Sequence, residues 1–93
     1  MSSEVPDART IMIRNQRGLH ARAAAKFVKI VGQHKARVLV CRNGMEVGGD
    51  SIMGLMMLAA GPGSSVRLQA SGPEAASVLD ALQALIERKF DEE

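Results

Sequence analysis

Aromatic side chains are almost absent from this chain of 93 residues, which contains two phenylalanines and neither tyrosine nor tryptophan. Proteins that bind single-stranded nucleic acid usually stack bases on aromatic side chains, so this scarcity counts against such binding. The formal net charge is only +2, and the basic residues are scattered along the chain, so charge alone provides no nucleic-acid footprint. We therefore expect no nucleic-acid partner and a core built from aliphatic residues and methionine.

Cysteine and long apolar runs are also scarce. The single cysteine, Cys41, excludes an internal disulfide and suits a reducing compartment. No apolar run approaches the roughly 20 residues needed to cross a bilayer, and residues 1–7 are polar and acidic, unlike a signal peptide. The two histidines, His20 and His34, and Cys41 lack the spacing of zinc ligands. These absences predict a cytoplasmic protein with no membrane association, no metal and no cofactor.

Apolar periodicity predicts the first two elements. Residues 10–14 alternate and include β-branched side chains, with Ile11 and Ile13 on one face, which is typical of a strand. A helix is predicted to begin near His20, because apolar residues then recur at the spacing of one buried helix face. These residues are Ala24, Phe27, Val28 and Val31.

The next segments predict a hairpin and a short helix. Asn43-Gly44 separates two apolar runs and favours a two-residue turn, because both central residues of that turn need positive φ. Such a turn would set Val40 across from Val47. Residues 51–59 are too apolar for a surface loop and predict a helix of about two turns, capped by Asp50 or Ser51.

The last two elements are a strand and a long helix. Residues 65–71 alternate and should place Val66, Leu68 and Ala70 inward. The sequence from Ser71 to Glu74 has the spacing of a capping box. Apolar residues then recur at helical spacing, namely Val78, Leu79, Leu82, Leu85 and Ile86.

The predicted order is strand, helix, strand, strand, helix, strand, helix, which indicates an α+β fold. We predict a two-layer open-faced β-sandwich, in which a four-stranded antiparallel sheet is covered on one face by three helices. Residues 1–8 are expected to form a flexible N-terminal leader, and residues 9–93 a single domain.

The strongest candidate for chemistry is His20, which stands where the first helix begins. Backbone N–H groups in the first turn of a helix lack intrahelical partners and carry partial positive charge. That environment disfavours an imidazolium and can receive phosphoryl oxygens, and Arg22 adds a planar donor group two residues later. A histidine at a helix start is nevertheless more often a cap or a surface residue, so local chemistry alone only suggests phosphorylation.

Two motifs carry a resemblance to a known family. The segment GLHARAAAKFV resembles the active-site signature of the HPr family of the phosphoenolpyruvate-dependent phosphotransferase system, usually written GLHARPA. The segment SIMGLMML resembles the second signature of that family, which surrounds a regulatory serine. The motifs lie at the family spacing, and the resemblance extends from about residue 9 to residue 88.

The resemblance implies a phosphocarrier, not a stand-alone enzyme for a small molecule. His20 would accept a phosphoryl group on Nδ1 from Enzyme I and pass it to an EIIA-type acceptor domain, while Arg22 would stabilise the phosphoryl group. Ser51 would be modified by HPr kinase/phosphorylase where that enzyme exists, and the carrier would act as a monomer. Ala23 replaces the signature proline; this form is similar to the nitrogen-related branch of the system, and since proline supplies no chemistry there, phosphoryl acceptance should survive.

The short helix supplies a predicted docking surface. Methionine side chains are adaptable and make good contact surfaces when exposed, and this helix holds more of them than one buried face can cover. We expect Ile52, Met53 and Met56 to form the apolar part of the surface and Arg22 and Lys26 its charged rim.

Two other interpretations stay open. The chain could be a regulatory binding module whose partners change when Ser51 is phosphorylated, although a serine that merely caps a helix needs no such role. It could also be a small α+β domain that binds peptide or RNA, against which the missing aromatics and the unfocused charge both count.

Overall fold

The computed structural model describes residues 7–92. Its strands are β1 (Asp7–Met12), β2 (Arg37–Arg42), β3 (Met45–Gly48) and β4 (Ser65–Ser71). Its helices are α1 (Ala21–Gly32), α2 (Ile52–Met57) and α3 (Ala75–Glu87), followed by a short turn with left-handed φ angles, η1 (Lys89–Asp91). The predicted order of strands and helices is confirmed, and η1 is an addition that no sequence pattern indicated.

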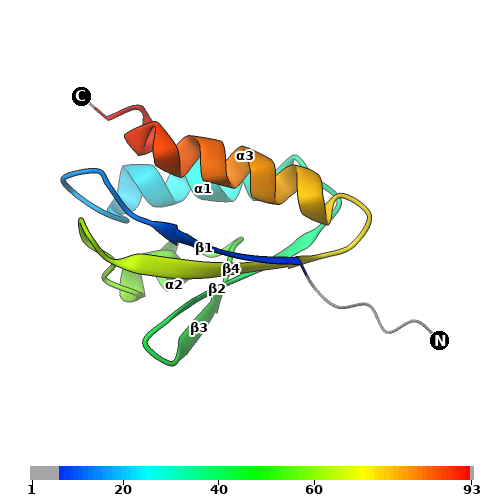
Figure 1. The fold of residues 1–93 in the computed structure, drawn as a ribbon, viewed down its shortest axis with the longest axis horizontal. Coiled ribbons are helices and arrows are strands. Elements are labelled where there is room, and N and C mark those ends of the chain that lie inside the picture. Colours follow the sequence, from blue (N-terminus) through cyan, green and yellow to red (C-terminus); the bar gives the residue numbers. More distant parts are fainter. Residues whose placement is uncertain (1–6, 93) are drawn as a thin grey trace.

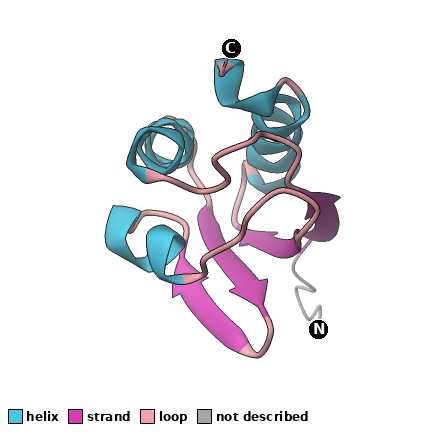
Figure 2. Cartoon of the chain, turned by 90° about the vertical axis from the view of Figure 1, so that its left-hand side faces the viewer, coloured by secondary structure: helices cyan, strands magenta, loops and turns pink. Residues whose placement is uncertain are grey.

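The strands form one open sheet in the order β1-β4-β2-β3, and each neighbouring pair is antiparallel. The helices lie over one face of this sheet (Figure 1). Figure 2 shows the two layers end-on, with the three helices on the same side of the strands. α3 packs over β1 and β4, α2 contacts β3, and α1 contacts both other helices. The predicted α+β open-faced sandwich is confirmed.

The apolar stripes form a core between the two layers. The residues predicted to face inward are buried, except Val28 and Val47, which are partly buried. Each large side chain in this core contributes about 1.5–3 kcal/mol through burial. The buried residues that the periodicity identified are Ile11, Ile13, Ala24, Phe27, Val31, Val66, Leu68, Ala70, Val78, Leu79, Leu82, Leu85 and Ile86.

The hairpin between β2 and β3 turns where the sequence predicts. Asn43 and Gly44 have φ angles of 50° and 79°, which are the positive values that a two-residue hairpin turn requires. Val40 lies directly opposite Val47. The predicted turn and its cross-strand pair are therefore confirmed.

The predicted start of α3 is wrong. Ser71 is not a helix cap, because it pairs with Arg37 and ends β4. The helix begins at Ala75, and Glu74 precedes it with no side-chain cap. The carboxylate of Glu74 instead accepts a hydrogen bond from the backbone N–H of Lys35, at 2.6 Å. Sheet pairing and this contact with the segment before β2 therefore displace the capping box that the spacing indicates.

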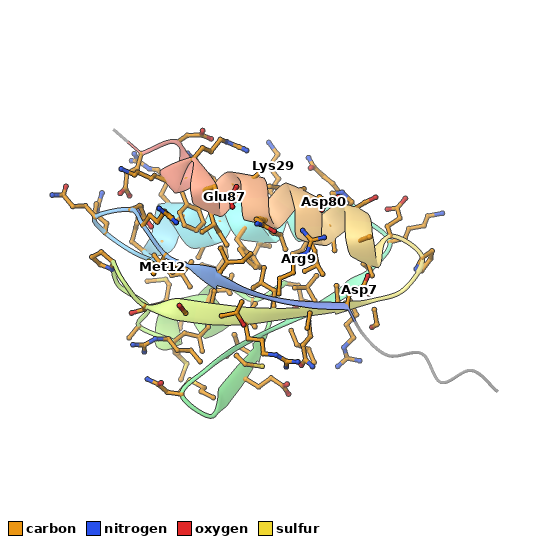
Figure 3. The ribbon with its side chains drawn as sticks, in the orientation of Figure 1. Asp7, Arg9, Met12, Lys29, Asp80 and Glu87 are labelled. Atoms are coloured by element: carbon orange, nitrogen blue, oxygen red, sulfur yellow. The ribbon has the colours of Figure 1, made fainter. Side chains whose placement is uncertain are left out.

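The expected boundary of the leader is also wrong in part. Asp7 and Ala8, assigned to the leader, belong to β1 and lie opposite residues of β4; residues 1–6 lie outside the described part. Arg9 in turn joins β1 to α3, because its guanidinium contacts Asp80 at 2.8 Å and donates a hydrogen bond to Gln83 at 2.9 Å. Figure 3 shows Arg9 and Asp80 turned toward each other.

Among residues 7–92, none of the helices combines the length and apolar character needed to cross a membrane.

Candidate functional site

A close backbone approach fixes the loop that carries His20. Gly18 has a φ of 63°, and a Cβ atom placed there would lie 2.2 Å from the carbonyl oxygen of Ala60. The next residue, Leu19, donates its backbone N–H to that same oxygen at 3.0 Å. Only glycine fits both the positive φ and the contact. The loop before α1 is thereby joined to the segment that follows α2.

His20 occupies the N-cap position of α1. Its backbone carbonyl accepts the N–H of Ala24 at 2.8 Å, but its side chain makes no capping hydrogen bond. The ring is therefore available for another use, and it is largely enclosed, with 17% of the side chain exposed. Within residues 7–92, neither Nδ1 of this ring nor the first-turn N–H groups of α1 make a hydrogen bond.

The contact partner of His20 is Glu92, a residue that sequence patterns did not single out. Nε2 of the histidine lies 2.6 Å from Oε2 of the glutamate. The glutamate carboxylate also accepts hydrogen bonds from the side-chain amide of Asn15, at 3.2 Å to each oxygen, and from the backbone N–H of Arg17, at 3.4 Å. Partial burial would raise the pKa of Glu92, but the hydrogen bonds from Asn15 and His20 outweigh it and lower the pKa.

A left-handed turn delivers Glu92 to the histidine. Lys89, Phe90 and Asp91 have φ angles of 59°, 55° and 58°, a conformation that residues other than glycine rarely adopt. The ring of Phe90 is buried, with 2% of its surface exposed, and its backbone carbonyl accepts a hydrogen bond from Nζ of Lys26 at 2.7 Å. Burial of this ring and the hydrogen bond from Lys26 both stabilise the turn, and no local sequence signal indicates it.

Lys26 makes a contact that the sequence did not indicate. Its ammonium group donates a hydrogen bond to the backbone carbonyl of Phe90 in the C-terminal turn, while its place at the rim of a docking surface stays a prediction. Arg22 is exposed, as expected, and it faces the same space as Lys26.

A cavity of about 300 Å³ opens beside the histidine ring. It is bordered by three basic side chains and two carboxylates from separate parts of the chain, so its lining is mixed in sign with a small excess of positive charge. Its lining residues are Arg17, His20, Arg22, Ala23, Lys26, Phe90, Asp91 and Glu92. Within the described residues there is no cluster of side chains suited to a metal ion.

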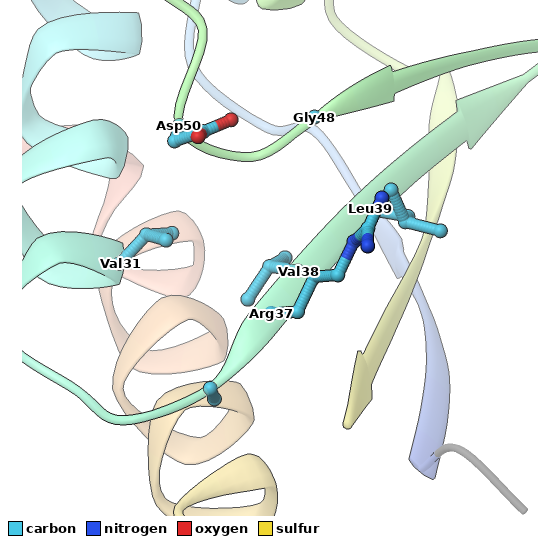
Figure 4. Close-up of a pocket in the computed structure, with 7 residues that line it drawn as sticks. Val31, Arg37, Val38, Leu39, Gly48 and Asp50 are labelled. Atoms are coloured by element: carbon cyan, nitrogen blue, oxygen red, sulfur yellow. The ribbon is translucent and has the colours of Figure 1, made fainter. Parts of the chain in front are cut away.

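A second cavity, of about 330 Å³, lies near the opposite end of α1 (Figure 4). It is lined by Val31 and by residues of β2 and the segment after β3, including Arg37 and Asp50. Among the described residues that line it there is no histidine, and the one carboxylate, Asp50, is exposed. Its size exceeds that of the cavity beside His20, but the chemistry favours the latter.

Ser51 caps α2. It is one of the two caps that the sequence predicts, the other being Asp50. Its hydroxyl oxygen accepts the backbone N–H of Gly54 at 2.9 Å. Directly after it, α2 exposes apolar side chains, most of all Met53 at 72%. The predicted exposure of Ile52, Met53 and Met56 is present, and α2 lies against α1 near the histidine.

Comparison with known proteins decides the family. The family model described as "PTS HPr component phosphorylation site" matches residues 8–88. The chain belongs to the HPr family. It is 49% identical to the phosphocarrier protein HPr of Cupriavidus necator over 84 residues, which are 90% of this chain and 94% of that protein. It is 50% identical to the HPr of Pseudomonas putida over 86 residues, covering 91% and 96% of the two chains.

The fold agrees with solved HPr structures. A crystal structure of HPr from Thermoanaerobacter tengcongensis superposes with a TM-score of 0.89, at 40% sequence identity, over 94% of this chain and 98% of that one. The chain is thus an HPr phosphocarrier of the phosphotransferase system in family and in fold.

We predict that Gly18→Ala lowers the free energy of unfolding by at least about 2 kcal/mol, because a side chain at this left-handed position is strained and also meets the Ala60 carbonyl. Urea denaturation measures the change. The matched control is Gly61→Ala, where an added Cβ meets nothing within 4 Å. Equal unfolding free energies for the two variants would contradict the anchoring role of Gly18.

The lowered pKa of Glu92 predicts a pH-dependent contribution to stability. A carboxyl group whose folded-state pKa is depressed stabilises the fold above its unfolded pKa, and that stabilisation is lost as pH falls through the folded value. Wild type should therefore be more stable than Glu92→Gln at pH 6, and the difference should shrink as pH falls below about 4.5, the ordinary value. Urea denaturation across this range tests it, with Glu87→Gln on α3 as control. A difference that stays constant down to pH 3 would contradict the assignment.

Proposed function

We propose that this HPr accepts a phosphoryl group from Enzyme I on His20 and passes it to an EIIA-type acceptor. One observation supports the proposal most. The His20 ring lies at the start of α1 without capping the helix, and it lines a cavity bordered by Arg17, Arg22 and Lys26. A transferring phosphoryl group is stabilised chiefly by positioning and by positive charge. Both are present around this ring.

The transfer would proceed through Nδ1 of His20. Its lone pair attacks phosphorus on the phosphohistidine of Enzyme I, so that a new N–P bond forms while the donor P–N bond breaks and its electron pair returns to the donor ring. The first-turn N–H groups of α1 and the guanidinium of Arg22 would receive the phosphoryl oxygens. Onward transfer repeats this exchange with the acceptor histidine.

The exposed face of α2 would dock both partners. Ile52, Met53 and Met56 provide an apolar surface beside the histidine-bearing end of α1. Ser51 would regulate docking when phosphorylated by HPr kinase/phosphorylase, because the added dianion would stand next to that apolar surface. The protein would then be both a phosphocarrier and a binding module regulated at Ser51.

Ala23 bears on the pathway in which this carrier would act. Ala23 is buried in the first turn of α1, where the family signature has proline, and we propose a role in the nitrogen-related branch on that ground. We further propose that the protein works in the cytoplasm as a monomer, although HPr of Thermoanaerobacter tengcongensis has also been crystallised as a dimer.

The carrier proposal is tested with Enzyme I and labelled phosphoenolpyruvate. We expect wild type to take up acid-labile phosphate and His20→Ala to take up none, because the acceptor nitrogen is lost. His34→Ala is the matched control, since it removes the other histidine of the chain and should be labelled like wild type. Label retained by His20→Ala would sink the proposal.

Substitutions at Ser51 distinguish its role as a helix cap from a role in regulating partner docking. Ser51→Asp keeps a good N-cap but adds negative charge beside Ile52 and Met53, so the rate of phosphoryl uptake from Enzyme I should fall by about tenfold or more, as expected when a charge opposes docking. Ser51→Ala, which lacks the charge, should transfer at close to the wild-type rate. Equal rates for Ser51→Asp and wild type would argue against a docking role for this end of α2.

A further inference from the structure

We propose that Glu92 is a positioning residue for phosphoryl transfer, because its carboxylate holds the His20 ring in the tautomer that leaves Nδ1 free to react. This inference rests on the proposed role of His20 as acceptor. It assigns a function to the C-terminal turn, which lies 72 residues away from the histidine in sequence.

The hydrogen-bond donors around Glu92 show which atom carries the proton shared by Nε2 of His20 and the carboxylate. Two atoms with lone pairs cannot approach to 2.6 Å unless a proton lies between them, and the other contacts of the carboxylate, from Asn15 and Arg17, are N–H donors. The carboxylate is thus an acceptor throughout, and the shared proton belongs to Nε2. A neutral imidazole carries one ring proton, so Nδ1 keeps its lone pair.

This tautomer suits both transfers. When Nδ1 attacks phosphorus, the ring retains its Nε2 proton and becomes a cation that carries the phosphoryl group. The negative charge of Glu92, 2.6 Å away, stabilises that cation. In onward transfer the N–P bond breaks and the ring leaves as a neutral imidazole; without the Nε2 proton it would have to leave as an anion, which is a far poorer leaving group.

The carboxylate is held by several independent contacts. The Asn15 side chain, 1% exposed, donates to both carboxylate oxygens and to the Gly18 carbonyl, so it links Glu92 to the loop before α1. On the other side, burial of Phe90 and the hydrogen bond from Lys26 fix the left-handed turn. Support of this kind behind a functional histidine orients its ring and sets its tautomer.

Glu92 does not imitate a bound phosphoryl group. Its oxygens contact Nε2, Asn15 and the backbone of Arg17, and none of them contacts Nδ1 or a first-turn N–H group of α1. The reactive nitrogen and the helix end thus stay accessible while the carboxylate is in place. This separation favours a supporting role over an inhibitory one.

The test combines a spectroscopic readout with a rate. Nitrogen NMR of the His20 ring should show the Nε2–H tautomer in wild type and a mixture of tautomers in Glu92→Gln. The rate of phosphoryl uptake from phosphorylated Enzyme I should fall by at least about tenfold in Glu92→Gln, the lower end of the cost of losing a carboxylate behind a functional histidine. The NMR spectrum also shows whether the variant is folded.

Glu87→Gln is the matched control. It removes the same side-chain charge, but Glu87 contacts Gln83 on α3 and does not line the cavity or contact His20. It should leave both the tautomer and the rate close to wild type. A wild-type tautomer and rate in Glu92→Gln, or equal slowing in both variants, would overturn the positioning role. Failure of wild type to accept phosphate would instead refute the proposed function, while the tautomer can be read without any transfer.

Discussion

The close contact between Gly18 and Ala60 is the constraint on which the site depends. It joins the loop after β1 to the segment between α2 and β4, and it does so through backbone atoms, which leave little freedom. Because of it, the loop that leads into α1 lies against the segment that follows α2. The histidine that would carry the phosphoryl group and the apolar surface that would dock partners are thereby held in a fixed relation.

The basic and acidic side chains of the site lie at different parts of the His20 ring and its cavity. Basic groups at Arg17, Arg22 and Lys26 border the cavity where a phosphoryl group would enter. The carboxylate of Glu92 lies instead against the opposite ring nitrogen, where hydrogen-bond donors compensate its charge. A negative group can therefore stand within a phosphate-accepting site without opposing the incoming phosphoryl group at Nδ1.

Local patterns predicted most of the fold because local and tertiary preferences agree there. Periodicity identified the buried faces of α1, β4 and α3, and Asn43-Gly44 identified the hairpin. The predictions of element boundaries failed where contacts with distant segments determine the structure. Ser71 resembles a helix cap but is held in the sheet by β2, and Asp7 and Ala8 belong to β1 because they pair with β4. In the site, the motif placed His20 correctly at a helix start, whereas Glu92 reaches it through a turn of positive-φ residues that sequence spacing does not encode.

The central claim is that His20 carries the phosphoryl group on Nδ1 while Nε2 keeps its proton. Nitrogen NMR of the histidine rings, after phosphorylation by Enzyme I and phosphoenolpyruvate, tests this most directly. We predict nitrogen–phosphorus coupling at Nδ1 of His20 and a proton on Nε2. Coupling at Nε2 of this ring, or at His34, would contradict the account.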